Sequence, residues 1–385
     1  MKRTNLMLLF TAGMLLASCG GQSGPSKNDI LKEASGKTAI AIWADSGAPI
    51  NRKLEKNKAE GAHAPILANS FTFKYESQTY TVKIDWKISD TENWTKYKSD
   101  EEHDVVIAKR QSVGGQTLEA NFTPTFTYED ATLTGDVYKF VCEPYEVDPQ
   151  NKTLAELSQG AYVDKNIKTG AVVRTQGIVT LHSPDYSSVI VENNGRTVQL
   201  YKGGAFSTFF EVGKAIQVVG KYKDYSGPEF DPVYDVSPTT DVPAITPLAL
   251  DKKTIDDFRA EWKDNGDHSQ GNRLTAGEFT VKEESKGKNK DETDRSKNTF
   301  DTLYLLTEDG GEFALYTKPG YAGDEGCKEI SKIFGGVKKG DKVKFKGALT
   351  YYSSKDLVEV NIYNPDDVEV TYVAPAEEGS AEQSA

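Results

Sequence analysis

Residues 189–201 read VIVENNGRTVQLY, and residues 304–316 read YLLTEDGGEFALY. The two stretches align without gaps, and each has apolar residues on both sides of a short polar centre. The centres are Asn194-Gly195 and Asp309-Gly310, which are pairs that close hairpins because type I′ turns need positive φ. Each stretch is therefore predicted to form a two-stranded hairpin, and the pair indicates an internal repeat.

A second match follows the first in the same order. Gly213-x-x-Ile-x-Val-x-Gly220 aligns on Gly340-x-x-Val-x-Phe-x-Gly347. The offset between the copies rises from 115 residues (201 to 316) to 127 residues (213 to 340), so the second copy carries 12 extra residues. These lie around 324–335 and are predicted to form a helix.

Each copy is predicted to contain a strand, a hairpin, a connector and two further strands. The first strand of copy one covers 171–181, with Gly177 as a bulge inside it, and that of copy two starts near Gly277. Five strands with a connector between the third and fourth is the layout of the OB-fold, a small Greek-key barrel. Residues 150–245 and 246–372 resemble the OB domains of bacterial secreted and lipid-anchored proteins, which implies two OB-fold-like five-stranded barrels.

The segment 37–148 shows the two-residue period of strands. Between residues 80 and 88, tyrosine, valine, isoleucine and tryptophan alternate with threonine, lysine and aspartate, which predicts one buried face that includes Trp86. Further strands are predicted at 105–108, 118–126 and 137–142. The segment resembles bacterial immunoglobulin-like domains, although Cys142 has no partner for the usual cysteine pair. The fold class is therefore mainly β, with an Ig-like β-sandwich followed by the two barrels.

The composition limits the function. The chain has 385 residues, a formal net charge of −12 and a mean hydropathy of −0.55, which argues against a broadly cationic nucleic-acid binder and against a multi-span membrane protein. Residues 149–245 carry nine basic and ten acidic residues, and the segments on either side are more acidic. Any nucleic-acid site is therefore expected on the first barrel.

The N-terminus has the pattern of a targeting signal. A basic start precedes the apolar run 6–16, which is too short to span a bilayer. It ends in Leu-Ala-Ser-Cys19 and resembles a bacterial lipobox, which implies a signal peptide at 1–18, a lipid on Cys19 and a place in the cell envelope outside the cytoplasm. The alternative is an ordinary signal peptide with an incidental cysteine. Residues 19–36 are predicted to be a flexible tether and 373–385 a disordered tail.

The search for catalytic motifs is negative. Gly36-Lys37-Thr38 lacks the glycine that a phosphate loop needs five residues earlier, where Leu31 stands. HExxH, CxxC and GxSxG do not occur, and the four histidines share no motif. We therefore expect a non-enzymatic protein without a metal or cofactor. Whether Cys142 and Cys327 form a disulfide or remain two buried thiols is left open.

The repeat selects candidate binding residues on the faces and loops that OB-folds use for ligands. Tyr201 and Tyr316 occupy one equivalent position, and Tyr225 and Tyr352 another. Exposed aromatics there would stack on nucleobases or on sugar rings, whereas the alternative is that they pack the barrel ends. The basic side chains expected beside them on the first barrel are Arg196, Lys202, Lys221 and Lys223.

Three functions remain open. The first is a lipid-anchored binding or accessory module that takes an unknown ligand or envelope protein on the barrel faces. The second is an accessory protein that captures single-stranded nucleic acid at the cell surface. The third is a structural spacer or adhesion protein.

Overall fold

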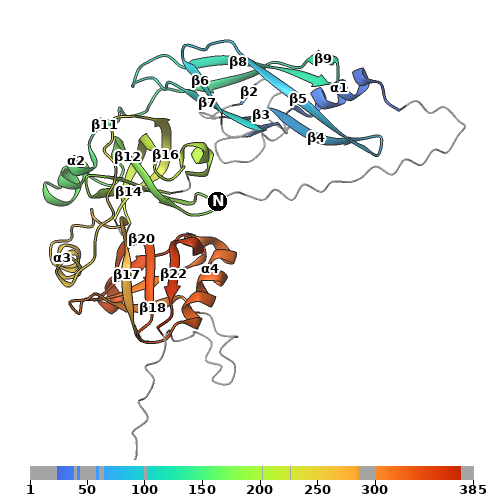
Figure 1. Ribbon diagram of the computed structural model, residues 1–385. Helices are drawn as coiled ribbons and strands as arrows, with labels where there is room; N and C mark the ends of the chain where they lie inside the picture. The colour runs from blue at the N-terminus through green and yellow to red at the C-terminus, as the bar shows by residue number, and fades with distance from the viewer. Residues whose placement is uncertain are drawn as a thin grey trace, which may run out of the picture.

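The computed structural model describes residues 24–38, 41–43, 58–59, 65–98, 102–201, 203–225, 227–283, 285 and 300–373. Within these residues the chain is mainly β. Figure 1 shows three parts that follow one another along a curve: a pair of sheets and then two barrels. The predicted fold class is confirmed at this level.

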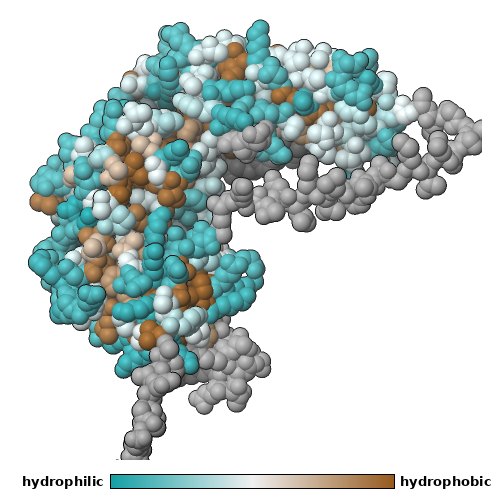
Figure 2. Space-filling view, viewed as in Figure 1, coloured by the Kyte–Doolittle hydropathy of each residue, from teal (hydrophilic) through white to brown (hydrophobic). Residues whose placement is uncertain are grey.

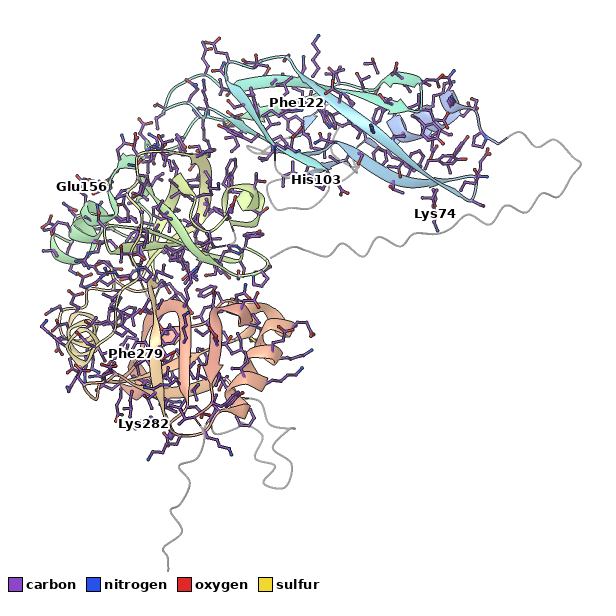
Figure 3. All side chains as sticks on the ribbon, viewed as in Figure 1. Lys74, His103, Phe122, Glu156, Phe279 and Lys282 are labelled. Carbon is purple, nitrogen blue, oxygen red and sulfur yellow. The ribbon has the colours of Figure 1, made fainter. Side chains whose placement is uncertain are left out.

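The N-terminal part has two sheets around one apolar core. The first sheet has the order β1 (Ile42–Trp43), β3 (Ile66–Ala68), β7 (His103–Ala108) and β6 (Trp94–Lys98). The second has the order β2 (Lys58–Ala59), β10 (Tyr138–Cys142), β8 (Leu118–Tyr128), β5 (Gln78–Ile88) and β4 (Ser70–Tyr75), with β9 (Ala131–Thr134) on β8. Phe122 of β8 is completely buried in this core (Figure 3).

The alternation in β5 has the predicted effect. Tyr80, Val82, Ile84 and Trp86 are buried, and the residues between them are exposed. Trp86 donates its indole N–H to the carbonyl of Ala68 at 2.9 Å, so its polar atom is satisfied inside the core. The strands predicted at 105–108, 118–126 and 137–142 are present as β7, β8 and β10. The resemblance to immunoglobulin-like domains stays a prediction.

The predicted tether needs a correction. Residues Lys27–Gly36 form helix α1, which begins with a capping box: Ser26 Oγ accepts from Asp29 N, and the Asp29 carboxylate accepts from Ser26 N. Ile30, Leu31 and Ala34 are buried in the core of the two sheets. The three apolar residues lie three and four positions apart, which is the spacing of one helix face, so the folded domain begins at α1.

The first barrel follows β11 (Gln150–Asn151), α2 (Leu154–Ser158) and the π-helical turn η2 (Gln159–Val163). Its strands are β12 (Val172–His182), β13 (Ser188–Asn193), β14 (Arg196–Tyr201), β15 (Ala215–Asp224) and β16 (Pro228–Pro238), with the 3-10 helix η3 (Gly203–Phe209) between β14 and β15. The strand order is β12-β13-β14-β16-β15, and β12 pairs with β15 to close the barrel. This is OB topology.

The second barrel repeats this order. Helix α3 (Lys252–Lys263) precedes β17 (Arg273–Glu283), β18 (Thr302–Leu306), β19 (Glu312–Tyr316), β20 (Lys342–Tyr352) and β21 (Leu357–Asn361). The pairing β17–β20 closes the barrel, and β22 (Val368–Thr371) adds to β20. Helix α4 (Pro319–Gly336) lies between β19 and β20, where the extra residues predicted a helix. Short 3-10 turns are η5 (Ser353–Lys355) and η6 (Pro365–Asp367).

The two hairpins differ in their turns, which corrects the gapless alignment. Asn194 (φ 51°) and Gly195 (φ 70°) form the predicted tight turn, whereas five residues separate Leu306 from its partner Glu312 and Asp309 has no positive φ. Ser188 pairs with Tyr201, and Thr302 pairs with Tyr316. The second strands of the hairpins therefore align as predicted, while the first strands are offset by one residue.

The bulge in β12 is also displaced from its predicted position. The register shifts between Val179 and Leu181, not at Gly177. A Cβ atom on Gly177 would lie 2.6 Å from Val191 Cγ1 and 2.7 Å from the carbonyl oxygen of Glu192. Gly177 thus allows β13 to approach closely, which is the other reason for a glycine inside a strand.

Several predictions fall on residues that the structure does not describe. The signal peptide, Cys19 and residues 374–385 of the predicted tail lie outside the described ranges. None of the helices in the described part of the chain has both the length and the apolar character needed to cross a bilayer. The surface in Figure 2 is mostly hydrophilic, with apolar patches that gather over the barrels.

Candidate ligand surface between the two barrels

The hairpin of the first barrel is bonded to the second barrel. Arg196 Nη1 donates to Ser269 Oγ at 2.8 Å, and the backbone N–H of Thr197 donates to the carbonyl of Ser269 at 3.2 Å. Glu192, which is 1% exposed, accepts from the backbone N–H of Leu274 at 2.8 Å. Because Ser269, Thr197, Glu192 and Leu274 are buried, each bond satisfies at least one atom that could not reach water.

An apolar contact supports the same junction. Leu181 and Ile190, on the outer face of the first barrel, form one cluster with Leu274, Ala348 and Tyr363 of the second. Tyr363 is 2% exposed, and its hydroxyl lies 3.4 Å from Ser188 Oγ. The outer faces of the two barrels therefore cover one another along part of their length, and the candidate tyrosines lie beside this contact.

Tyr201 and Tyr316 end equivalent strands. Tyr201 is the last residue of β14 and lies opposite Ser188, while Tyr316 is the last residue of β19 and lies opposite Asn361. Both are half-buried and point away from the barrel cores, whose apolar residues alternate with them. Since Ser188 contacts Tyr363, Tyr201 is next to the junction.

Tyr225 and Tyr352 are the more exposed pair. Tyr225 follows β15 and is 75% exposed, and Tyr352 ends β20 and is 44% exposed. The Lys355 ammonium lies 5.5 Å from the centre of the Tyr352 ring. Its exposure leaves the Tyr352 ring accessible to a flat ligand, and the Lys355 ammonium places a positive charge next to the ring.

A further tyrosine, Tyr321, lies close to Tyr316 and to Tyr363. The Tyr321 ring, at the start of α4, lies 6.5 Å from that of Tyr316 and 5.1 Å from that of Tyr363. Burial, with smaller contributions from Glu359 and Tyr225, raises the pKa of Tyr321 to about 12. Tyr321 also packs against the apolar cluster that joins the two barrels. We call Tyr201, Tyr225, Tyr316, Tyr321 and Tyr352 the tyrosine surface.

Charged groups border the tyrosine surface. The Lys318 ammonium lies 4.4 Å from the centre of the Tyr321 ring, within the range of a cation–π contact. Lys223 forms an ion pair with Asp231, which raises the pKa of Lys223. Burial raises the pKa of Glu229, and nearby Asp231 adds to the effect. The border therefore carries both signs of charge.

Glu359 is the most perturbed carboxyl group here. It lies on β21 opposite Ala314 and Thr350, on the outer face of the second barrel. Burial raises its pKa to about 7, although Lys355 and Lys318 act in the opposite direction. A carboxyl group with this pKa is neutral in a large fraction of molecules near pH 7, and it both donates and accepts hydrogen bonds in that form.

The structure separates the candidate basic residues. Lys223 lies near Tyr201, but its charge is paired with Asp231. Arg196 donates a hydrogen bond to the second barrel. Lys221 is an exposed residue of β15, and its side chain lies near Gly170, which belongs to the loop before β12. Lys202 lies outside the described residues.

Tyr321, Lys318 and Glu359 were not selected from the sequence. Tyr321 lies between β19 and β20, where the second copy has extra residues, so comparison with the first copy gave no signal for it. Glu359 lies in the last strand of the barrel, which the repeat did not align. A single glutamate between apolar residues of a strand does not show, from the sequence alone, which side chains of other elements lie near it in the fold.

The remaining cysteines belong to separate cores. Cys142 is buried among the N-terminal sheets, and Cys327 of α4 packs against the core of the second barrel. They are not joined by a disulfide: Cys142 is buried, and Cys327 is partly exposed. Among the described residues, no three His, Cys, Asp or Glu side chains gather as metal ligands.

No protein-family model matches the chain, and no curated protein matches it. Among solved structures, the p204 HINb domain matches 54% of this chain and 100% of its own at 12% identity, with a TM-score of 0.28. The Ifi202 HINa domain, in complex with 20-bp double-stranded DNA, matches 52% of this chain and 98% of its own at 13% identity and a TM-score of 0.28.

The single-stranded DNA binding protein from Thermus aquaticus matches 55% of this chain and 97% of its own at 12% identity, with a TM-score of 0.21. The OB topology of the two barrels follows from the strand order and closure described above.

Proposed function

We propose that this chain is a binding protein whose two barrels together hold a ligand with flat rings on the tyrosine surface. The observation that carries the proposal is the position of Tyr321, which packs against the apolar cluster that joins the two barrels and lies 6.5 Å from the Tyr316 ring. Exposed aromatic rings bind bases by stacking, and each stacked base contributes roughly 1–3 kcal/mol. A surface with several such rings suits an extended ligand rather than a single small molecule.

Single-stranded nucleic acid is the ligand class that the lysine–tyrosine pairs favour. The ammonium groups of Lys318 and Lys355 lie beside the rings of Tyr321 and Tyr352, where the backbone of a stacked strand would run. Because only a few cations border the surface and the chain is acidic overall, stacking would supply most of the affinity. Two phosphate contacts correspond to a salt slope of about −1.4, which is shallow for a nucleic-acid protein.

A carbohydrate is the second candidate, because of the carboxyl groups. Glu229 and Glu359 border the tyrosines, and burial raises the pKa of both. Carboxyl groups beside aromatic rings match the hydroxyls and the flat face of a sugar. Carboxylates would repel phosphate, so the two ligand classes differ in their response to Glu229.

Binding of a labelled oligothymidine, measured by fluorescence anisotropy at low salt, tests the proposal. The double variant Tyr225→Ala/Tyr352→Ala is expected to bind at least tenfold more weakly, since it removes two stacking rings. Tyr372→Ala is the matched control, because Tyr372 is 65% exposed but follows β22, away from this surface.

Absence of an anisotropy change with the wild-type protein would remove nucleic acid as the ligand. A soluble oligosaccharide in the same assay, detected by competition or by tyrosine fluorescence, then tests the second candidate. Loss of binding in the Tyr372→Ala control would show that the effect is not specific to the tyrosine surface.

We also propose that the protein has no enzymatic activity of its own and is held at the cell envelope by a lipid on Cys19. The lipobox-like sequence supports the anchor, and one lipidated cysteine with its chains is enough for durable membrane attachment. The variant Cys19→Ala is expected to move from the membrane fraction to the soluble fraction. A variant that stays with the membranes would show that Cys19 is not the anchor.

A further inference from the structure

The turn between β15 and β16 carries Tyr225 of the tyrosine surface. Asp224, the last residue of β15, pairs with Pro228, the first residue of β16. Within the turn, Tyr225 N donates to the carbonyl of Gly227 at 3.0 Å. The Tyr225 side chain is 75% exposed, so few neighbouring atoms hold its ring. The direction of the ring therefore depends on the backbone of this turn and on the contacts that fix that backbone.

A short turn of the second barrel is built on Trp262 of α3. Gly271 N donates to the carbonyl of His268 at 2.9 Å, which closes the turn 268–271 between α3 and β17. A Cβ atom on Gly271 would lie 2.7 Å from Trp262 Cζ3, so the backbone of the turn lies directly on the indole. The His268 ring stacks on the same indole, with 4.3 Å between the ring centres. Because Trp262 is buried, it gives His268 a defined orientation.

His268 contacts the first barrel at Asp224. Its Nδ1 atom lies 3.4 Å from Asp224 Oδ1, and the Tyr162 hydroxyl donates to the same oxygen at 3.1 Å. Burial acts to raise the pKa of Asp224, but the hydrogen bonds from His268 and Tyr162 hold it below its usual value. A carboxylate only accepts, so His268 Nδ1 carries the proton and donates.

The backbone of His268 also approaches the turn that carries Tyr225. A Cβ atom on Gly227 would lie 3.3 Å from the carbonyl oxygen of His268, so the two turns are in close contact. The side chain of His268 thus contacts one end of the β15–β16 turn, and its carbonyl lies against the other. The second barrel therefore holds the turn of the first barrel at both ends.

We propose that His268 is a positioning residue for the tyrosine surface, because its hydrogen bond to Asp224 fixes the turn that presents Tyr225. This inference rests on the proposed function. A ring that is already held in its binding direction loses less conformational freedom when the ligand arrives. His268 therefore raises the affinity through Tyr225, without contacting the ligand itself.

Two substitutions separate the hydrogen bond of His268 from its ring. His268→Phe keeps a ring that can stack on Trp262 but has no donor for Asp224. His268→Asn has no ring, but its Nδ2 takes the place of Nδ1 and donates. Anisotropy with labelled oligothymidine should show binding that is about three- to tenfold weaker in His268→Phe, which corresponds to the loss of one hydrogen bond. His268→Asn should bind as the wild type does.

Chemical denaturation of the same variants distinguishes positioning from packing. If His268 only packs the barrels together, the affinity follows the free energy of unfolding, and His268→Asn, which loses the stack, binds more weakly than His268→Phe. That result would overturn the positioning role. Ser269→Ala is the matched control: it removes the acceptor of Arg196 in the same turn and at the same junction, but leaves His268 and Asp224 in place. It should keep the affinity of the wild type.

A double-mutant cycle with Tyr225→Ala decides whether His268 acts through Tyr225. Once the positioned ring is absent, adding His268→Phe should weaken binding no further, whereas two independent residues would multiply their effects. Multiplied effects, or wild-type binding by His268→Phe, would overturn the positioning role while leaving nucleic-acid binding intact. Absence of oligothymidine binding by the wild-type protein would overturn the proposed function, and the positioning role with it.

Discussion

At the scale of single residues, the junction of the barrels depends on buried polar groups with specific partners. Glu192 accepts from Leu274 N across the junction, and the guanidinium Nε of Arg273 lies 3.6 Å from its carboxylate. Burial raises the pKa of Glu192, and the two partners only partly offset the cost. A buried acceptor that pairs with a donor of the neighbouring barrel fixes the relative orientation of the two barrels. Apolar contacts, which are not directional, would fix this orientation less well.

Replacing Glu192 tests this role. Glu192→Ala leaves the N–H of Leu274 without an acceptor and is expected to lower the free energy of unfolding by about 1–3 kcal/mol. Chemical denaturation followed by tyrosine and tryptophan fluorescence measures the change. Glu308→Ala, at an exposed position in the β18–β19 turn, is the matched control and should have little effect.

The variant Glu192→Gln separates the hydrogen bond from the charge. Its amide oxygen can still accept from Leu274, and it does not ionise. Because the folded-state pKa of Glu192 lies above the unfolded value, the wild type loses stability as the pH rises from the unfolded pKa through the folded one. Glu192→Gln should lose less over this range, and equal losses in the two proteins would contradict the assignment.

At the scale of elements, the hairpin β13–β14 does more than build the first barrel. Its tight turn places Gly195 against the second barrel, where a Cβ atom would lie 3.1 Å from Arg273 Cζ. The corresponding turn of the second barrel contains Gly310, whose added Cβ would meet nothing within 4 Å. The hairpin turn therefore contacts the second barrel in the first copy, whereas in the second copy Gly310 has open space around it.

This difference gives a paired prediction. Gly195 (φ 70°) and Gly310 (φ 83°) both adopt a left-handed conformation, so alanine at either position should cost about 1–2 kcal/mol. Only Gly195→Ala also pushes against Arg273, and it is expected to lower the unfolding free energy more than Gly310→Ala. Thermal unfolding of the two variants makes the comparison, and equal destabilisation would show that the turn does not bear on the second barrel.

The elements also show what sequence patterns can predict. Strand β5 and the OB order were predictable because a two-residue period and a repeated hairpin leave local signals. Helix α1 was assigned to a tether because the small residues 20–26 that precede it are typical of a flexible linker. Tyr201, Tyr225, Tyr316 and Tyr352 were found through the repeat, whereas Tyr321 and Glu359 enter the surface through tertiary contacts that no local pattern records.

At the scale of the whole molecule, the candidate site exists only where the two barrels are docked. The outer face of β20 contributes Ala348, which is fully buried against Leu181 and Ile190 of the first barrel. The same strand ends at Tyr352, so docking and ligand binding share one face of the second barrel. A ligand that contacts Tyr225 and Tyr321 together must find both barrels in this orientation.

The variant Ala348→Glu should separate the barrels. A carboxylate at this position would be buried without a partner, which costs several kcal/mol, and undocking would return it to water. We expect a larger radius of gyration by small-angle X-ray scattering, together with loss of oligothymidine binding by at least tenfold. The control Lys344→Glu reverses a charge at an exposed position of the same strand and should leave the radius unchanged.

The two measurements together decide whether the surface is shared. Undocked barrels that still bind oligothymidine as the wild type does would place the ligand on one barrel alone, contrary to the proposal. A compact variant that no longer binds would instead assign the effect to the added charge on the strand face that also carries Tyr352. Loss of compactness and loss of binding in the same variant, with both properties kept in Lys344→Glu, is the result that a site built from two barrels requires.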